Sequence, residues 1–242
     1  MTGPAYPPLT APGGKMVDTM PFKRLRICVM TISDTRTDET DTSGHLLADR
    51  VKEAGHEVAD KAIVPDEVNA IRAVMRKWIA DPTIDAVVTT GGTGLTGRDV
   101  TPEAVRPLFD KEIEGFNVVW HLVSFQSVGT STLQSRACAG VANATFIFCL
   151  PGSNGAVKDG WDGILASQLD ARHRPCNFVE LLPRLQAAVP TIEHHERPEY
   201  LDRLAMLRDQ VFTLDHIFLS LFGSLGIVVR LIVVMIVLRS GR

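Results

Sequence analysis

The sequence predicts an α/β domain with a mostly parallel, mixed β-sheet that is covered by helices on both faces. Between about residues 23 and 184, short runs rich in β-branched residues alternate with stretches whose apolar residues recur at helical spacing, the pattern of βαβ units. Two later apolar runs, residues 137–142 and 145–150, are separated only by Asn143 and Ala144. So short a connection favours an antiparallel hairpin, which makes the sheet mixed.

The first half of this region contains three predicted strands, with a helix after each of the first two. Residues 24–32 form the first strand, and the next helix begins at Asp41, which caps it, and ends at Gly55. Residues 57–64 form the second strand and residues 85–90 the third. The helix between these two strands carries one apolar stripe, formed by Ile71, Val74, Met75 and Trp78.

The second half begins with a glycine cluster directly after the third strand. Pro102 is expected in the first turn of the next helix, with Thr101 as its cap. A longer apolar helix is predicted for residues 116–125, and its Trp120, Val123 and Phe125 could supply a contact between subunits. After the hairpin, a Pro-Gly-Ser sequence ends the last strand and leads into a final helix, whose apolar residues are Val157, Trp161 and Ile164.

Composition excludes several classes of protein. In 242 residues, 45% are apolar and 22% charged, which excludes a wholly disordered chain. The net charge of −3 offers no electrostatic basis for binding nucleic acid, so no nucleic-acid partner is expected. The four cysteines form no C-x-x-C pair, which argues against a zinc knuckle or a disulfide framework.

Two flanking regions differ in composition from the central domain, which we place at residues 21–186. Residues 1–20 are rich in proline and glycine and are predicted to be a flexible leader. Residues 187–242 form an extension whose apolar segment, residues 217–238, is long enough to span a bilayer and is interrupted only by Arg230. A membrane anchor, a buried or oligomerising helix, and a tail that is not authentic are three open interpretations of this segment.

The glycine cluster is the first candidate binding element. Gly91, Gly92, Thr93 and Gly94 follow a strand directly, so that backbone N–H groups converge at its carboxyl end, where they can bind phosphate oxygens. The alternative is a tight turn that only needs glycine at positive φ. A dinucleotide-binding fingerprint is disfavoured, because the next helix begins only at Pro102.

Two aspartates are expected beside these glycines. Asp99 lies just past the cluster, and Asp66 follows the neighbouring strand. Two carboxylates that face bound phosphates are matched to Mg²⁺, which takes one or two carboxylates together with phosphate oxygens and water. Helix capping is the alternative role for each. Arg136 ends a hydroxyl-rich segment and could bind phosphate through two hydrogen bonds, unless it is an ordinary surface arginine.

Three motifs give the chain a resemblance to a known family. TTGGTGLTGRDVTPEA, GTSTLQSRACAGVAN and LPGS, in this order, resemble the MoaB/Mog family of molybdenum-cofactor biosynthesis proteins, and the MoaB branch more than the Mog branch. The resemblance covers about residues 24–185. It implies a three-layer α/β/α, molybdopterin-binding-like domain that is cytoplasmic and forms a homotrimer or homohexamer. Membrane association through residues 217–238 is the alternative localisation.

The resemblance also implies an activity and a set of residues. Active family members bind molybdopterin and transfer AMP to its terminal phosphate from Mg-ATP, with pyrophosphate as the leaving group. Asp66 and Asp99 are then expected to handle metal and nucleotide, Ser135 to be a pterin-site hydroxyl, and Pro151, Gly152 and Ser153 to bind substrate with the glycine cluster and Arg136. A non-catalytic pterin-binding accessory protein and a trimeric scaffold remain the alternatives.

Overall fold

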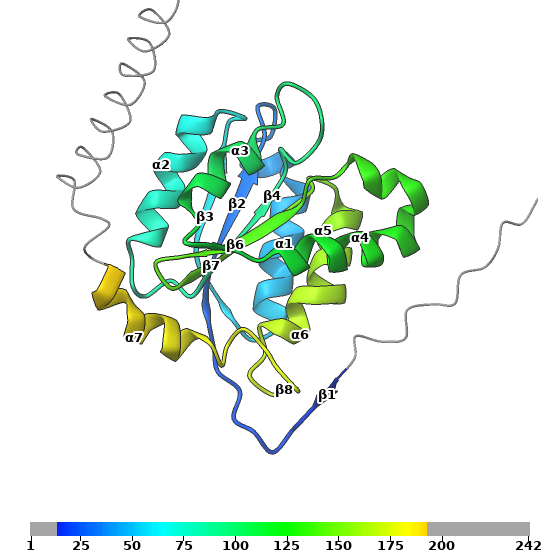
Figure 1. The fold of residues 1–242 in the computed structure, drawn as a ribbon. Helices are drawn as coiled ribbons and strands as arrows, with labels where there is room; N and C mark the ends of the chain where they lie inside the picture. The colour runs from blue at the N-terminus through cyan, green and yellow to red at the C-terminus, as the bar shows by residue number, and fades with distance from the viewer. Residues whose placement is uncertain (1–13, 193–242) are drawn as a thin grey trace, which may run out of the picture. The chain divides into compact units, whose positions relative to one another are not determined.

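Residues 14–192 are described by a computed structural model of the protein, and the chain divides after Val189 into two compact units (Figure 1). The sheet and the helices that cover it belong to the first unit. The predicted apolar segment, residues 217–238, and the first thirteen residues of the predicted leader lie outside the described part. Within residues 14–192, none of the helices is both long and apolar enough to cross a membrane.

A six-stranded mixed sheet forms the centre of the domain, as predicted. Its order is β3-β2-β4-β7-β6-β5. The first four strands in this order are parallel, and β6 and β5 are each antiparallel to their neighbour. The strands are β2 (Arg26–Ile32), β3 (Glu57–Val64), β4 (Ala86–Thr90), β5 (Lys111–Glu112), β6 (Cys138–Ala142) and β7 (Thr145–Leu150).

Helices cover both faces of this sheet. The α-helices of the described residues are α1 (Thr42–Glu53), α2 (Val68–Ile79), α3 (Thr101–Val105), α4 (Glu114–Val128), α5 (Asn154–Gly160), α6 (Ala166–Gln168) and α7 (Leu182–Ile192), of which α7 extends past the end of the first unit. Figure 1 shows α2 and α3 on one side of the sheet, with α1, α4 and α5 on the other. The predicted three-layer α/β/α architecture is therefore confirmed.

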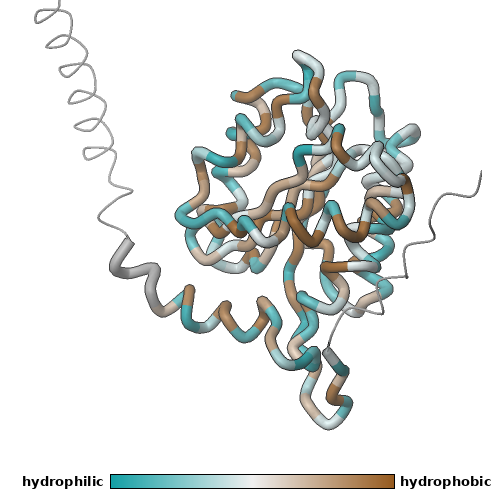
Figure 2. Tube along the Cα trace, turned by 45° about the vertical axis from the view of Figure 1, so that its right-hand side comes forward, coloured by the Kyte–Doolittle hydropathy of each residue, from teal (hydrophilic) through white to brown (hydrophobic). Residues whose placement is uncertain are grey.

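Alternation along the central strands explains why both faces are covered. In β2, Ile27 and Val29 pack against the layer of α1, α4 and α5, whereas Cys28 and Met30 pack against α2 and α3. A strand whose two faces are both buried reads as a continuous apolar run, and this was the signal in the sequence. Figure 2 shows the same concentration of hydrophobic residues in the strands at the centre of the domain.

Two local predictions about turns and caps are confirmed. Asp41 caps α1, because its carboxylate accepts a hydrogen bond from the backbone N–H of Gly44 at 2.9 Å. Asn143 and Ala144 both have positive φ, +46° and +63°, as a two-residue turn between antiparallel strands requires. The register of β6 and β7 follows from this turn.

The helix predicted for residues 116–125 is confirmed and is longer, Glu114–Val128. Two other local predictions are wrong. Thr101 does not cap α3: Val100 holds that position, and the Thr101 hydroxyl donates to the carbonyl of Gly91 at 2.9 Å. Residues 15 and 16 of the predicted leader form β1 (Lys15–Met16), which pairs antiparallel with β8 (His173–Arg174), so this part of the leader is held by backbone hydrogen bonds.

Candidate active site

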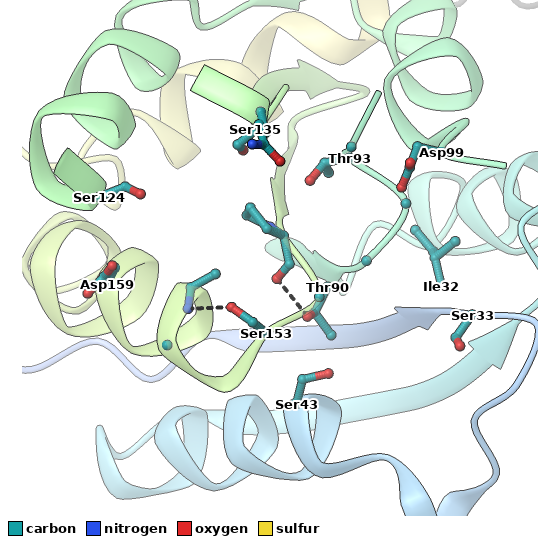
Figure 3. Close-up of a pocket in the computed structure, with 18 of the residues that line it drawn as sticks. Ile32, Ser33, Ser43, Thr90, Thr93, Asp99, Ser124, Ser135, Ser153 and Asp159 are labelled. Carbon is teal, nitrogen blue, oxygen red and sulfur yellow. Dashed lines mark hydrogen bonds between the residues drawn. The ribbon is translucent and has the colours of Figure 1, made fainter. Parts of the chain in front are cut away.

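A cavity of about 670 Å³ opens at the carboxyl ends of the parallel strands (Figure 3). This edge is where ligands bind in open α/β sheets. The turns after β2, β3, β4 and β7 all reach it, and the segment that precedes β6 reaches it because β6 runs in the opposite direction. The predicted site residues that line it are Asp66, Gly91, Gly92, Thr93, Gly94, Asp99, Ser135, Pro151, Gly152 and Ser153. These residues, which are far apart in the sequence, therefore line a single cavity.

The glycine loop, residues 91–94, requires glycine at its first two positions. Gly91 and Gly92 have φ of +109° and +63°, and a Cβ on Gly91 would collide with the carbonyl oxygen of Ile32. Gly91 and Gly92 therefore form a tight turn, as the alternative interpretation required, and this turn lines the cavity. Within residues 14–192, the backbone N–H groups of Gly92 and Thr93 have no hydrogen-bond partner, which leaves them available to a ligand.

Asp99 closes the turn that follows the glycine loop. Its carboxylate accepts hydrogen bonds from the backbone N–H and the hydroxyl of Thr96, at 2.9 and 2.6 Å, and one from the backbone of Gly94. Burial alone would raise the pKa of Asp99, but these hydrogen bonds outweigh it, and the pKa is lowered. Asp99 is therefore an ionised and positioned carboxylate at the cavity.

Asp66 differs from Asp99 because its surroundings disfavour the charged form of its carboxylate. Burial and the nearby carboxylate of Asp34 are the main causes that raise its pKa, and the charge of Asp99 adds to them. The alternative role of helix cap does not apply, because Glu67 is the cap residue of α2 and the Asp66 carboxylate instead accepts the backbone N–H of Asp34 at 3.1 Å. Since Asp66 and Asp99 influence each other and line one cavity, they lie on the same edge of the sheet.

The role predicted for Arg136 is not the one the structure shows. Its guanidinium donates to the carbonyl oxygens of Gly94 and Asp99, at 2.7 and 2.6 Å, and forms an ion pair with Glu103. Its backbone N–H also donates to the carbonyl of Thr93. Arg136 is absent from the cavity lining, and all three of its guanidinium nitrogens donate to acceptors in or near the glycine loop and α3.

Two other arginines, Arg36 and Arg98, supply the positive charge of the lining. Arg98 immediately precedes Asp99 and forms an ion pair with Asp34, at 2.8 Å from its Nε to the carboxylate. Arg98 could have been predicted as a site residue from the sequence, because it lies inside the glycine-rich motif and immediately precedes Asp99.

The cavity has two chemically different ends. We call the glycine loop with Asp66 and Asp99 the carboxylate end. We call Ser124 and Ser127 of α4 with Asp159 of α5 the serine end, where the Ser127 hydroxyl donates to Asp159 at 2.8 Å. Figure 3 shows Asp99 and Asp159 on opposite sides of the cavity. Sequence reasoning missed the serine end, for which the spacing of two serines by one helical turn was the available signal.

Metal binding at this site would depend on the substrate. Among residues 14–192, no group of three or more His, Cys, Asp or Glu side chains is arranged to hold a metal ion. Mg²⁺ commonly binds through one or two carboxylates and completes its shell with phosphate oxygens and water. Asp66 and Asp99 fit that donor set.

Known proteins resemble this chain over the domain that carries the cavity. A protein-family model described as "Probable molybdopterin binding domain" matches residues 28–171. Molybdenum cofactor biosynthesis protein B of Escherichia coli K12 is 57% identical over 157 residues, which cover 65% of this chain and 92% of that protein. The residues matched by the family model include the glycine loop and both aspartates of the carboxylate end.

Solved structures resemble the fold as well. A crystal structure of a molybdenum cofactor biosynthesis protein B has a TM-score of 0.62 at 38% identity and covers 68% of this chain and 98% of its own. The tungsten cofactor synthesizing protein MoaB from Pyrococcus furiosus has a TM-score of 0.57 at 32% identity, with the same coverage of both chains. The chain therefore belongs to the MoaB/Mog family of molybdenum cofactor biosynthesis proteins.

Proposed function

We propose that this protein transfers AMP from Mg-ATP to the terminal phosphate of molybdopterin. One observation carries the proposal: both carboxylates lie against the glycine loop at one end of the cavity. A Cβ on Gly92 would lie 3.0 Å from Asp66 Oδ1, and one on Gly94 would lie 2.7 Å from Asp99 Oδ2. Backbone donors for phosphate and carboxylate ligands for magnesium are thus adjacent, as a metal-nucleotide site requires.

The two ends of the cavity suit the two parts of the reaction. At the carboxylate end, the N–H groups of Gly92 and Thr93 would bind phosphate oxygens, and Asp66 and Asp99 would hold Mg²⁺, which supplies positive charge to the phosphates when bound. At the serine end, the hydroxyls and Asp159 offer acceptors and donors for the pterin ring. A cavity of about 670 Å³ lies in the usual range for small-molecule sites.

Positioning and charge neutralisation would provide most of the catalysis. The attacking oxygen belongs to a phosphate that is already anionic at neutral pH, so the residues need not remove a proton from it. What the chain must do is align that oxygen with the α-phosphorus of ATP. Arg136 contributes indirectly, because it fixes the carbonyls of Gly94 and Asp99 and so the shape of the loop.

The proposal is tested by measuring pyrophosphate release with molybdopterin and Mg-ATP. We expect Asp99→Asn to reduce the rate at least about a hundredfold, because it removes a charge at the position where phosphate charge must be balanced. Asp49→Asn is the matched control, since Asp49 is 65% exposed on α1 and lies outside the cavity lining. Full activity in Asp99→Asn would remove this residue from the mechanism.

We also propose that α4 contributes to contacts between copies of the chain. Of the three residues that the sequence suggested for this contact, Trp120 is only 1% exposed, whereas Val123 and Phe125 are partly exposed. The outward face of α4 instead carries Val118, Val119 and Leu122, exposed by 61%, 43% and 50%. Adjacent exposed apolar side chains are typical of protein interfaces. Light scattering of wild type and Leu122→Glu tests this, and an unchanged oligomeric mass in the variant would exclude the face.

A further inference from the structure

Two arginines line the cavity, and they differ in how they are held. Arg36 donates to the backbone carbonyl of Thr40 at 2.7 Å, within its own loop. Arg98 instead reaches across to Asp34, in a loop 64 residues earlier in the chain, and its side chain is 64% exposed. An exposed ion pair between two loops is weak, since water and salt screen it. Arg98 is therefore the lining cation that can most easily exchange its partner.

Asp34 is fixed independently of Arg98. Its Oδ1 accepts the backbone N–H of Asp66 at 3.1 Å, and its own N–H donates to Asp66 Oδ2 at the same distance. The hydrogen bond from Arg98 is the main cause that lowers the pKa of Asp34, so the carboxylate is charged at neutral pH. Of the two partners in the ion pair, the aspartate stays in place and the arginine has the long, solvent-exposed side chain.

The charges around Arg98 change when a metal-bound polyphosphate enters. The charges of Asp34 and Asp99 both act on Asp66, and Arg98 is the cation that offsets them at that carboxylate. A divalent ion would neutralise part of this negative charge, and the phosphates would offer a guanidinium a geometry for two parallel hydrogen bonds. Both changes favour transfer of Arg98 from the carboxylate to the phosphate.

We propose that Arg98 binds the polyphosphate of the nucleotide and that Asp34 holds it at the cavity until the substrate arrives. This rests on the proposed function, since it assumes a magnesium-bound polyphosphate at the carboxylate end. Asp34 then acts as a competitor of the substrate for the same guanidinium. Removing Arg98 should weaken polyphosphate binding, whereas removing the charge of Asp34 should strengthen it.

The experiment is calorimetric titration of the full-length protein with inorganic tripolyphosphate in the presence of Mg²⁺. We expect Arg98→Gln to bind about tenfold more weakly than wild type and Arg98→Lys to recover part of the loss. Asp34→Asn should bind about threefold more tightly. The amide oxygen that Asp34→Asn introduces can still accept the N–H of Asp66, so the loop is retained, and thermal unfolding of each variant checks this.

The double variant separates this exchange from a general effect of charge. If Asp34 acts by competing for Arg98, Asp34→Asn will not strengthen binding in the Arg98→Gln background. Arg106→Gln is the matched control, because Arg106 has an exposed ion pair with Glu112 and is not part of the cavity lining, and it should bind as wild type does.

Three results would overturn the inference: no tripolyphosphate binding by wild type, wild-type affinity in Arg98→Gln, or equal strengthening by Asp34→Asn in both backgrounds. Failure of the proposed function is recognised separately. Arg98-dependent tripolyphosphate binding without any pyrophosphate release from ATP and molybdopterin would leave the inference standing and reject adenylyl transfer.

Discussion

The carboxylate end and the serine end of the cavity are built in different ways. At the carboxylate end, turns at the ends of strands place the groups, and hydrogen bonds such as those from Thr96 to Asp99 fix the turns. At the serine end, side chains of α4 and α5 face each other across a helix–helix contact, joined by the bond from Ser127 to Asp159. A change at the carboxylate end should therefore disturb both structure and chemistry, whereas one at the serine end should alter only ligand affinity.

The largest effect is expected for Gly92→Ala. The residue has φ of +63°, and a Cβ would collide with the Thr101 hydroxyl, so the glycine loop must shift. We expect loss of activity by more than about a hundredfold and destabilisation of about 2–3 kcal/mol, measured by denaturant unfolding.

Gly97→Ala provides the control for this substitution. Gly97 lies a few residues further along the same exposed segment, and a Cβ there would meet nothing within 4 Å. The free energy of unfolding should stay within about 0.5 kcal/mol of wild type, and activity should be unchanged. Equal effects of the two substitutions would mean that the conformation of the glycine loop is not required.

The two aspartates should differ in their effects on stability although both are needed for activity. The pKa of Asp66 is raised, so the folded state binds its proton more tightly than the unfolded state, and stability increases as pH falls through that pKa. The pKa of Asp99 is lowered, so its contribution is present above the unfolded pKa and is lost as pH falls through the folded one.

At pH 7 we therefore expect Asp66→Asn to raise Tm slightly and Asp99→Asn to lower it, while each reduces the rate of pyrophosphate release about a hundredfold. Without substrate, magnesium binding by wild type should weaken on acidification as Asp66 takes up its proton, because Asp99 stays ionised to lower pH. Calorimetry over a pH series measures both effects. A fall in Tm for Asp66→Asn would contradict the unfavourable environment assigned to this carboxylate.

A substitution at the serine end should have a selective effect. We expect Asp159→Asn to weaken molybdopterin binding about tenfold, since a charged hydrogen-bond acceptor becomes neutral. Binding of magnesium tripolyphosphate, titrated in parallel, should be unchanged. Equal losses for both ligands would show that the two ends are not independent.

The smallest effect is expected for Ser153→Ala. Ser153 lies between the two ends in Figure 3 and caps α5, where its hydroxyl accepts the backbone N–H of Ala156 at 3.1 Å. Loss of the cap should cost about 1 kcal/mol in unfolding free energy. The matched substitution Ser167→Ala removes a hydroxyl that caps no helix, and a cost as large as that of Ser153→Ala would exclude the capping explanation.

The difference between the two ends also explains what the sequence could predict. The glycine loop, Asp66 and Asp99 were predictable because each directly follows or lies close behind an apolar strand, and parallel strands bring such positions to one edge. Arg136 was predicted to bind phosphate, but its side chain is oriented by hydrogen bonds to the carbonyls of Gly94 and Asp99. No sequence pattern indicates such contacts.

The serine end was missed for a related reason. The face that α4 turns to the cavity is set by how Trp120 packs in the core, and its serines are few among many apolar residues. The short strands β1 and β8 could not be predicted, because a strand of two residues has no detectable alternation of apolar and polar side chains. Positions fixed by local backbone geometry could be predicted, and positions fixed by packing between distant elements could not.

The most direct test of adenylyl transfer is to incubate the purified full-length protein with Mg-ATP and molybdopterin and to determine the mass of the pterin product. We predict a pterin that carries AMP, formed together with an equal amount of pyrophosphate by wild type and by neither Asp66→Asn nor Asp99→Asn. Molybdopterin that stays bound but unmodified while ATP remains intact would contradict the proposed activity.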